Sequence, residues 1–442
     1  MTNPATATTA ADKETTPYPS FGRSVAVWAI PAVFYLAGFY LRASPGPMTA
    51  ELMRDFNISA GPLGNLSAMY FYAYVLMQIP TGVLVDSWGP RRLLIGGALM
   101  AAVGTVIFGT TSSFVVASLG RALIGASTAV AWVVTLKLAT HWLPGQRFAL
   151  IAGLSLFMGN VGALVAQVPL RMGVEHFGWR AVSLVSAVVV VAIAGIAFLF
   201  VKNDPSEEGA ASYAPAVLQQ QASLGGLLKA FPTIFTYRNT WLIFLAQGGT
   251  VGAVMSFTIL WGPPFLKSAY GVTPTRATAI CSIMTLSWAI ASPLFGLASD
   301  RLKRRKLPYL TGAIVASCGW ITLFMVPGLP LAVFTIVGAI TAFACGGVII
   351  GFPYAKESVP VRFLATVSGA INLGNMVGPM VLQPGIGWML DRLWTGDAAG
   401  AARVYPVESF RIAFLLLIGW SVLTCVLISL TRDTRCQQNV DA

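Results

Sequence analysis

Long apolar runs separated by short polar turns dominate the chain. A helix that crosses a membrane needs about 20 mostly apolar residues, and twelve stretches reach that length. They cover residues 24–47, 62–86, 92–112, 114–140, 147–171, 178–201, 240–266, 275–299, 307–327, 330–355, 363–388 and 409–431. The pattern therefore predicts an all-α integral membrane protein with twelve transmembrane helices. Because twelve is even, both ends of the chain are expected on the same side of the membrane.

One polar stretch divides these helices six and six. It covers residues 202–236 and is predicted to link two six-helix bundles, at 24–201 and 237–431. Its last part, residues 224–235, has the composition of a short amphipathic helix. Residues 1–23 lack an apolar core, so they are expected to form a disordered tail and not a secretory signal. Residues 432–442 form a second tail.

Composition and charge agree with a membrane protein. Hydrophobic residues make up 56% of the 442 residues and charged residues only 10%, whereas soluble domains carry about 25% charged residues. The net charge of +12 does not indicate nucleic-acid binding, because most Lys and Arg residues fall on one predicted side, which marks the cytoplasm. The sequence predicts a multi-pass protein of a bacterial inner (plasma) membrane with both termini cytoplasmic. The five cysteines form no C-x-x-C pair, so metal and redox sites are not expected.

Two of the short loops carry the same motif. The first runs from Gly82 to Arg92 and reads Gly-Val-Leu-Val-Asp-Ser-Trp-Gly-Pro-Arg-Arg; the second runs from Gly296 to Arg305, with Lys303 where the first has its second glycine. The first copy resembles the signature G-x-x-x-D-x-x-G-R-[RK] that the major facilitator superfamily carries between helices 2 and 3. The resemblance implies a secondary carrier with two six-helix bundles related by a pseudo-two-fold axis.

The resemblance also implies a gating role for the motif. Charge-assisted contacts of its aspartate would hold the cytoplasmic side shut in one state and break in the other. The predicted gating residues are Gly82, Asp86, Gly89, Arg91, Arg92, Asp300 and Arg304. The alternative is a plain cytoplasmic turn that carries the positive charges expected on that side.

An internal repeat supports a duplicated fold. Pro144, Gly153, Gly162 and Gln167 recur as Pro360, Gly369, Gly378 and Gln383, each 216 residues later. The motif loops are offset by 214 residues. Two distant blocks with nearly equal offsets indicate parallel repeats, which is how two halves of such a carrier are built.

Two cations within the predicted helices are candidates for the substrate site. Arg42 lies toward the outer end of the first helix, with Tyr35 seven residues earlier on the same face. Tyr40-Leu41-Arg42 looks like the Tyr-x-Asp-Arg of organic-anion carriers in the superfamily, except that Leu41 replaces the aspartate. Lys137 lies within the fourth helix. Either cation could instead snorkel to a membrane surface, but none of the sixteen Asp and Glu residues lies mid-span, which favours an anionic substrate.

Amide side chains complete the predicted substrate site. Asn372, Asn375 and Gln383 follow one another on the eleventh helix, and Gln167 is the repeat partner of Gln383. These amides would line a cavity near the midplane, or would join helices by hydrogen bonds.

Together these features predict a carrier that moves a small, anionic organic solute by alternating access, with protons or a counter-transported ion as the coupled species. The alternative is a proton-coupled exporter of drugs or metabolites, and a third class is a sensor or scaffold of the same fold. We expect no enzymatic activity and no cofactor, since no phosphate-binding G-x-x-x-x-G-K-[ST] occurs. The expected partners are the solute and membrane lipid, with the protein as a monomer and no nucleic acid.

Overall fold

The computed structural model describes residues 17–214 and 231–438, apart from 397 and 400–401. Residues 1–16 of the expected N-terminal tail, residues 215–230 of the linker and residues 439–442 lie outside the described residues. Most of the expected amphipathic helix at 224–235 is therefore outside them too, although residues 231–234 are helical. We call residues 17–214 the N-terminal half and residues 231–438 the C-terminal half.

Helices make up nearly all of the N-terminal half. Several spans consist of two or three helical pieces joined without a loop. The elements are α1 (Phe21–Ala43), η1 (Gly46–Met48), α2 (Thr49–Asp55), α3 (Ala60–Trp88), α4 (Pro90–Thr110), α5 (Phe114–Thr128), α6 (Val130–Trp142), η2 (Gly145–Arg147), α7 (Phe148–Val165), α8 (Val168–Phe177), α9 (Trp179–Phe200) and η3 (Pro205–Glu208).

The C-terminal half repeats this arrangement and adds one short hairpin, whose two strands have two residues each. Its elements are α11 (Arg238–Met255), η5 (Ser256–Trp261), α12 (Gly262–Tyr270), α13 (Pro274–Leu302), α14 (Lys306–Met325), α15 (Leu331–Cys345), η6 (Gly346–Ile350), α16 (Gly351–Glu357), η7 (Val361–Phe363), α17 (Leu364–Arg392), β1 (Ala398–Ala399), β2 (Ala402–Arg403), α18 (Val407–Ala413) and α19 (Leu415–Leu430). The two strands pair antiparallel. The predicted all-α membrane fold is confirmed apart from this hairpin.

The predicted number of spans is met only in part. Ten helical segments of the described residues are long and apolar enough to cross a membrane, and α3, bent by 58° at Pro80, is an eleventh. A proline bends a helix because it lacks an N–H and its ring clashes with the preceding turn. The remaining predicted span is α17, which is as long as α3. Its asparagines, glycines and prolines lower its hydropathy, so it does not qualify by composition.

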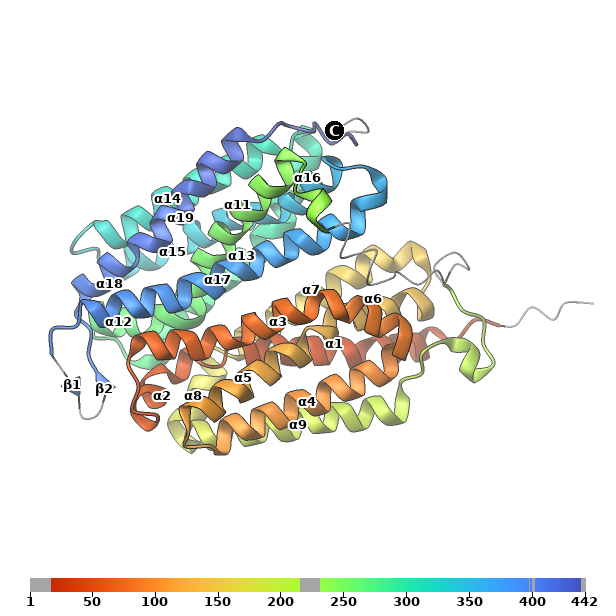
Figure 1. Ribbon diagram of the computed structural model, residues 1–442, viewed down its shortest axis with the longest axis horizontal. Coiled ribbons are helices and arrows are strands. Elements are labelled where there is room, and N and C mark those ends of the chain that lie inside the picture. Colours follow the sequence, from red (N-terminus) through yellow and green to blue (C-terminus); the bar gives the residue numbers. More distant parts are fainter. Residues whose placement is uncertain (1–16, 215–230, 397, 400–401, 439–442) are drawn as a thin grey trace, which may run out of the picture.

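The helices form two groups that meet along a few contacts (Figure 1). In the N-terminal half α1 packs on α6 and α7, and α4 packs on α5 and α9; in the C-terminal half α11 packs on α17 and α19, and α13 packs on α15. The groups touch mainly where α3 runs beside α17 and where α7 and α8 meet α13. The exact predicted domain boundaries stay predictions.

Glycine packing shows the internal repeat in three dimensions. A Cβ on Gly162 of α7 would lie 2.1 Å from the Leu36 carbonyl oxygen of α1, and one on Gly378 of α17 would lie 2.1 Å from the Gly248 oxygen of α11. Only glycine allows backbones to approach so closely. The predicted repeat therefore places two equivalent helix crossings in the two halves.

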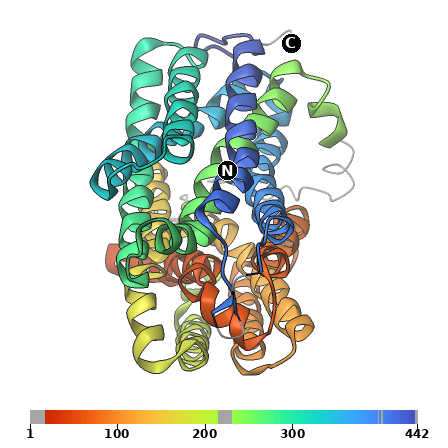
Figure 2. The same ribbon diagram turned by 90° about the vertical axis from the view of Figure 1, so that its left-hand side faces the viewer.

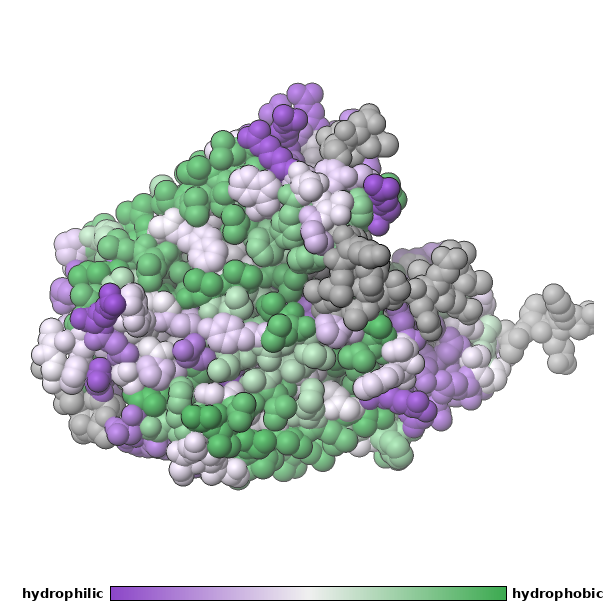
Figure 3. All heavy atoms as spheres, in the orientation of Figure 1, coloured by the Kyte–Doolittle hydropathy of each residue, from purple (hydrophilic) through white to green (hydrophobic). Residues whose placement is uncertain are grey.

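The outer surface is apolar along the length of the helices. On α9, for example, Val185, Val188 and Leu199 are each more than 60% exposed. On the face shown in Figure 3, apolar residues cover much of both halves, and polar residues gather toward the two ends. A continuous exposed apolar surface of this kind fits a lipid environment and not water.

Candidate functional site

The two ends of the molecule differ, and we name them by their residues. The linker end is where α9 stops and α11 starts, at the right of Figure 1; the sealed end is the opposite one, where α3 starts and α17 stops. At the sealed end the β1–β2 hairpin of the C-terminal half lies against α2 of the N-terminal half (Figure 2). Toward the linker end the ribbons of the two halves diverge (Figure 1).

An interrupted helix helps to join the halves at the sealed end. Between α11 and α12 the chain forms one π-helical segment, η5, which Pro263 and Pro264 follow. These prolines supply no N–H to the carbonyls of Thr258 and Ile259, five residues before them. The Gln167 side chain of the N-terminal half donates to the Thr258 oxygen at 3.0 Å. Gly46 sits against the Ile259 oxygen so closely that a Cβ would lie 1.7 Å from it.

Arg42 is a buried cation near the end of α1. It is 3% exposed, its guanidinium carbon lies 3.8 Å from the ring centroid of Phe39, and its Nε is enclosed without a hydrogen-bond partner. Within the described residues it forms no ion pair. Tyr35, Tyr70 and Tyr74 are close enough to interact with its charge. A buried charge without a counter-ion is costly and marks a functional candidate.

A second buried arginine positions the first. Arg121 of α5 is fully buried and donates to the backbone oxygens of Leu41 and Arg42, at 2.6 and 3.3 Å. Cations at a helix C-terminus satisfy its last carbonyls and its dipole. Arg121 therefore fixes the end of α1 that carries Arg42.

The predicted amides lie at the interface of the halves, at different depths. Gln167 and Gln383 are buried near the sealed end, and no atom of the Gln383 side chain has a hydrogen-bond partner. Asn375 is 9% exposed with an unpartnered Oδ1. Asn372 is partly exposed and interacts with the Tyr74 hydroxyl across the interface. Among these amides, Asn372 is thus placed beside the tyrosines that surround Arg42.

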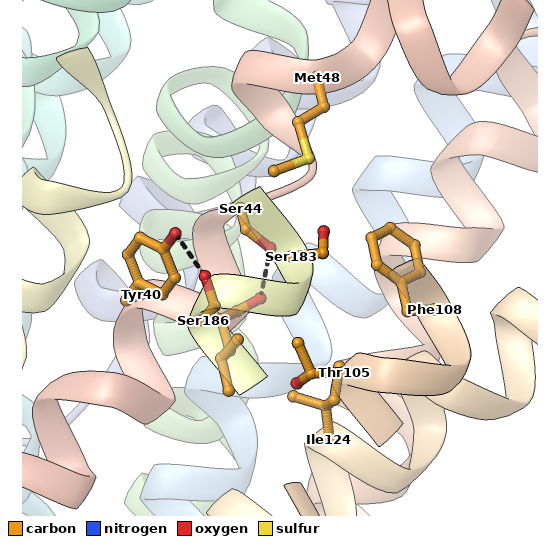
Figure 4. A pocket seen from close by; sticks show the side chains of 9 residues that line it. Tyr40, Ser44, Met48, Thr105, Phe108, Ile124, Ser183 and Ser186 are labelled. Atoms are coloured by element: carbon orange, nitrogen blue, oxygen red, sulfur yellow. Dashed lines mark hydrogen bonds between the residues drawn. The ribbon is translucent and has the colours of Figure 1, made fainter. Parts of the chain in front are cut away.

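A cavity beside the end of α1 is too small for a solute. It lies within the N-terminal half, between α1, α4, α5 and α9, and its volume is about 10 Å³, which is room for about one water molecule. Tyr40, Ser44, Ser183 and Ser186 point into it, and the Tyr40 and Ser186 hydroxyls lie 2.9 Å apart (Figure 4). This cavity is a packing feature of one half and not the substrate site.

The first motif loop forms its contacts within the N-terminal half. Asp86 accepts a hydrogen bond from Lys137 of α6 at 2.8 Å, and both side chains are about one-quarter exposed. The structure therefore pairs two residues to which the sequence assigned separate roles, gating and substrate binding. The spacing contained a signal for this pair, because both residues lie within about one and a half turns of the linker-end termini of their helices.

The glycine and arginine of the same loop hold the start of the linker. Gly89 has a φ of 81°, which favours glycine, and a Cβ there would lie 2.7 Å from Asn203 Oδ1. Asn203 accepts from the Arg91 backbone N–H at 3.0 Å, and the Arg91 side chain donates to the Phe198 oxygen at 2.7 Å. Arg92 is exposed and Gly82 packs against nothing within 4 Å.

A carboxylate fixes the linker beyond that point. Asp204 Oδ2 lies 2.6 Å from His141 Nδ1 and accepts from the Ser212 hydroxyl at 2.7 Å. Partial burial raises the pKa of Asp204, but hydrogen bonds from His141, Ser206 and Ser212 outweigh it and lower the pKa to about 2. The beginning of the linker is therefore anchored to the N-terminal half.

In the second motif loop, Arg305 forms the ion pairs, and the predicted gating residue Arg304 forms none in the part of the chain that the structure describes. Arg305 is 7% exposed and pairs with Asp300 and with Glu357 of α16, at 2.5 and 2.8 Å. Arg304 is exposed and its side chain forms no bond within the described residues. Lys303, in the place of the motif glycine, adopts the left-handed region at φ 49°. The missing glycine was a signal that the register of the basic residues after it could differ from the first copy.

The charged residues that are buried within the described part of the chain are all positive. The buried charged residues are Arg42, Arg121, Arg171 and Arg305, with no Asp or Glu among them. Arg121 bonds backbone oxygens, and Arg171 and Arg305 pair with carboxylates. Within the same residues no group of three His, Cys, Asp or Glu side chains could hold a metal. Among these four buried cations of the described residues, Arg42 is the one whose side chain has neither a backbone oxygen nor a carboxylate as its partner.

Comparison with known proteins gives the family. The model of the Major Facilitator Superfamily matches residues 31–265 and 244–440. A probable sulfoacetate transporter of Cupriavidus necator is 21% identical over 84% of this chain and 88% of its own length, and a putative tartrate transporter of Agrobacterium vitis is 24% identical over 89% and 88%. A probable galactarate/D-glucarate transporter of Escherichia coli is 22% identical over 86% and 90%.

Solved structures show the same fold. A bacterial homologue of the human lysosomal transporter Spinster, in an inward-facing and unoccupied conformation, superposes with a TM-score of 0.77 at 17% identity, covering 93% of this chain and 97% of that one. The nucleoside transporter NupG superposes with a TM-score of 0.70 at 11% identity. The matched relatives are membrane transporters and not enzymes. The resemblance inferred from the Gly82–Arg92 motif is confirmed: this multi-pass membrane protein belongs to the major facilitator superfamily.

Proposed function

We propose that the protein carries a small organic anion across the membrane by alternating access, with Arg42 as the residue that receives the anion. The observation that carries the proposal is the burial of Arg42 without a counter-ion among the described residues. Bringing an anion to such a site offsets the cost of the buried charge, and a planar guanidinium can hold a carboxylate by two parallel hydrogen bonds.

The surroundings of Arg42 give the site its contacts to both halves. Tyr35 and Tyr74 belong to the N-terminal half, and Tyr74 interacts with Asn372 of the C-terminal half. An anion held by Arg42 and these hydroxyl and amide groups would contact both halves, as a rocking mechanism requires. Lys137 does not enter the proposal, since Asp86 already neutralises it.

The relatives support the substrate class. Three of the similar carriers are named for sulfoacetate, tartrate and galactarate/D-glucarate, all of which are small organic anions. The lack of a buried Asp or Glu in the described residues argues in the same direction. A buried acid is what a carrier of cationic drugs would need to neutralise its cargo.

The distribution of charge supports an orientation. The linker end carries Arg91, Arg92, Arg147, Arg301 and Arg304, which supports a cytoplasmic position for it by the positive-inside rule. The state described here would then be closed toward the outside and would release its solute inward. We extend this to a location in a bacterial inner membrane, with uptake driven by protons or by exchange of anions.

The test is anion binding by the purified protein. Arg42→Ala should weaken binding of tartrate, glucarate or sulfoacetate at least about tenfold, which is the loss of one charge-assisted hydrogen bond. Arg276→Ala removes an exposed cation from the start of α13 and should leave the affinity unchanged. Thermal shift and calorimetry measure both variants.

The outcomes separate the candidate functions. If wild-type protein binds an anion and Arg42→Ala binds it equally well, the assignment of Arg42 is wrong. If reconstituted protein shows no counterflow of any of the three anions but extrudes cationic dyes along a pH gradient, the protein is a proton-coupled exporter.

A further inference from the structure

We propose that Asp391 is a gating residue that holds the sealed end closed by capping α3 across the interface of the two halves. This inference rests on the proposed alternating access, because a contact between the halves matters for gating only if the halves separate. It concerns the end of the molecule opposite to the two motif loops.

The Asp391 carboxylate, on the last turn of α17, is directed at the start of α3. It accepts from the Ser59 hydroxyl at 2.6 Å, from the Gly61 N–H at 2.8 Å and from the Ala60 N–H at 3.1 Å. The first N–H groups of a helix have no partner within it, and the helix dipole favours an anion there. The cap of an N-terminal helix therefore comes from the C-terminal half.

A tyrosine completes the contact. Tyr405 donates its hydroxyl to Asp391 at 2.6 Å, and the Ala60 N–H donates to the same hydroxyl at 3.0 Å. Partial burial raises the pKa of Tyr405, and so does its hydrogen bond to Asp391, so its hydroxyl stays a donor near neutral pH. Arg403 adds a weaker contact to the carboxylate at 3.6 Å.

The internal repeat supplies a second contact of the same kind. Glu175, at the end of α8, accepts from the hydroxyl of Thr275 at the start of α13. The two carboxylates are 216 residues apart in the sequence, and so are the two hydroxyls, Ser59 and Thr275. This is the offset of the repeat. The pseudo-two-fold relation therefore places a carboxylate-to-hydroxyl contact on both sides of the interface.

The two contacts are unequal. Asp391 receives three hydrogen bonds from the other half, donated by Ser59, Ala60 and Gly61, and a fourth from Tyr405 of its own half. Within the described residues, Glu175 accepts one hydroxyl from the other half, and its remaining partner is Arg171 of its own half. Charge-assisted hydrogen bonds are about twice as strong as neutral ones. Asp391 is thus the stronger of the two contacts, and its loss should release the sealed end more than loss of Glu175.

Such contacts can break and form again, because water can replace the protein partner of the carboxylate and of the N–H groups. When the halves separate at the sealed end, water can hydrate the Asp391 carboxylate and the N–H groups of α3. The contact therefore favours one state without making the other inaccessible. The geometry assigns to Asp391 a share of the free-energy difference between the two states.

The test measures the separation of the halves without a substrate. Spin labels on Ser112→Cys and Pro327→Cys, both exposed at the sealed end, report the distance between the halves in full-length, reconstituted protein whose native cysteines are replaced. Asp391→Asn should raise the ratio of open to closed sealed ends about tenfold or more, because the amide offers one acceptor atom and no charge. Tyr405→Phe should shift the ratio in the same direction by less.

A matched control excludes general damage. Asp55 lies at the same end and accepts from the Trp179 indole at 2.8 Å, but both partners belong to the N-terminal half. Asp55→Asn should leave the label distance unchanged. If Asp391→Asn and Tyr405→Phe both keep the wild-type distance distribution, or if Asp55→Asn shifts it equally, the gating role is wrong. Anion binding is not measured here, so a failure of the proposed substrate leaves this result standing.

Discussion

The sealed end and the linker end of this carrier use polar residues in opposite ways. Near the sealed end, hydrogen bonds join the two halves, as between Gln167 and Thr258 and between Ser59 and Asp391. At the linker end, the ion pair of Asp86 with Lys137 and that of Arg305 with Glu357 each stay within one half. Within the described residues no hydrogen bond joins the halves there. If the halves separate as proposed, one end would select the conformation, while the other would keep each half rigid.

The largest effect should come from blocking the close approach at the sealed end. A Cβ on Gly64 of α3 would lie 2.5 Å from the Gln383 backbone oxygen of α17. Gly64→Leu would force these backbones apart, and overpacking of this kind costs about 1–3 kcal/mol or more. We expect it to hold the sealed end open and to reduce transport below about a tenth, measured as anion counterflow in liposomes together with the label distance.

A glycine that faces open space provides the control for this variant. Gly96 of α4 is exposed and has nothing within 4 Å of its Cβ position. Gly96→Leu should leave both readings near wild type. If Gly64→Leu transports normally, the close approach of α3 and α17 is not required for turnover.

The next largest effect should come from Gln167→Leu, and Gln383→Leu should not share it. Gln167→Leu would leave the Thr258 oxygen without a donor, since Pro263 cannot supply one, and an orphaned buried carbonyl costs about 1–3 kcal/mol. The ratio of open to closed sealed ends should therefore rise about tenfold. Gln383→Leu removes side-chain atoms that have no partner, so this variant should keep or strengthen closure. Equal behaviour of the two variants would contradict the assignment of distinct roles.

This contrast also shows what the sequence could and could not predict. Hydropathy predicted the helices, and the offset of 216 predicted that Gln167 and Gln383 occupy equivalent places in the two halves. Their contacts were not predictable, because these depend on a break in the partner helix. The sequence places Pro263 and Pro264 near the end of the predicted helix 240–266, but it does not show that a free carbonyl there would face Gln167 across the interface.

Charge pairs show the same limit. The sequence places Arg42 and Lys137 within apolar helices, and helix spacing alone does not show which of them has a partner. The structure pairs Lys137 with Asp86, which is 51 residues earlier in the chain, and leaves Arg42 without a carboxylate in the described residues. Likewise, the motif predicted Arg304, whereas the left-handed Lys303 brings Arg305 to Asp300 and Glu357. Which charged side chains pair depends on how the helices pack and which faces they present to each other, and the sequence of one helix does not show this.

The smallest effect tests the linker end, through the pair of Asp86 and Lys137. Both side chains are about one-quarter exposed, and exposed or half-exposed pairs contribute about 0.2–1 kcal/mol. A double-mutant cycle of Asp86→Asn and Lys137→Met should therefore give a coupling energy of that size, measured by thermal unfolding in detergent. Because the pair lies within one half, neither variant should change the distance between the sealed-end labels. Lys137→Met should also keep the anion affinity that Arg42→Ala loses. A large loss of anion affinity in Lys137→Met would show instead that the pair opens to bind substrate, and the contrast between a conformation-selecting end and a rigid end would no longer hold.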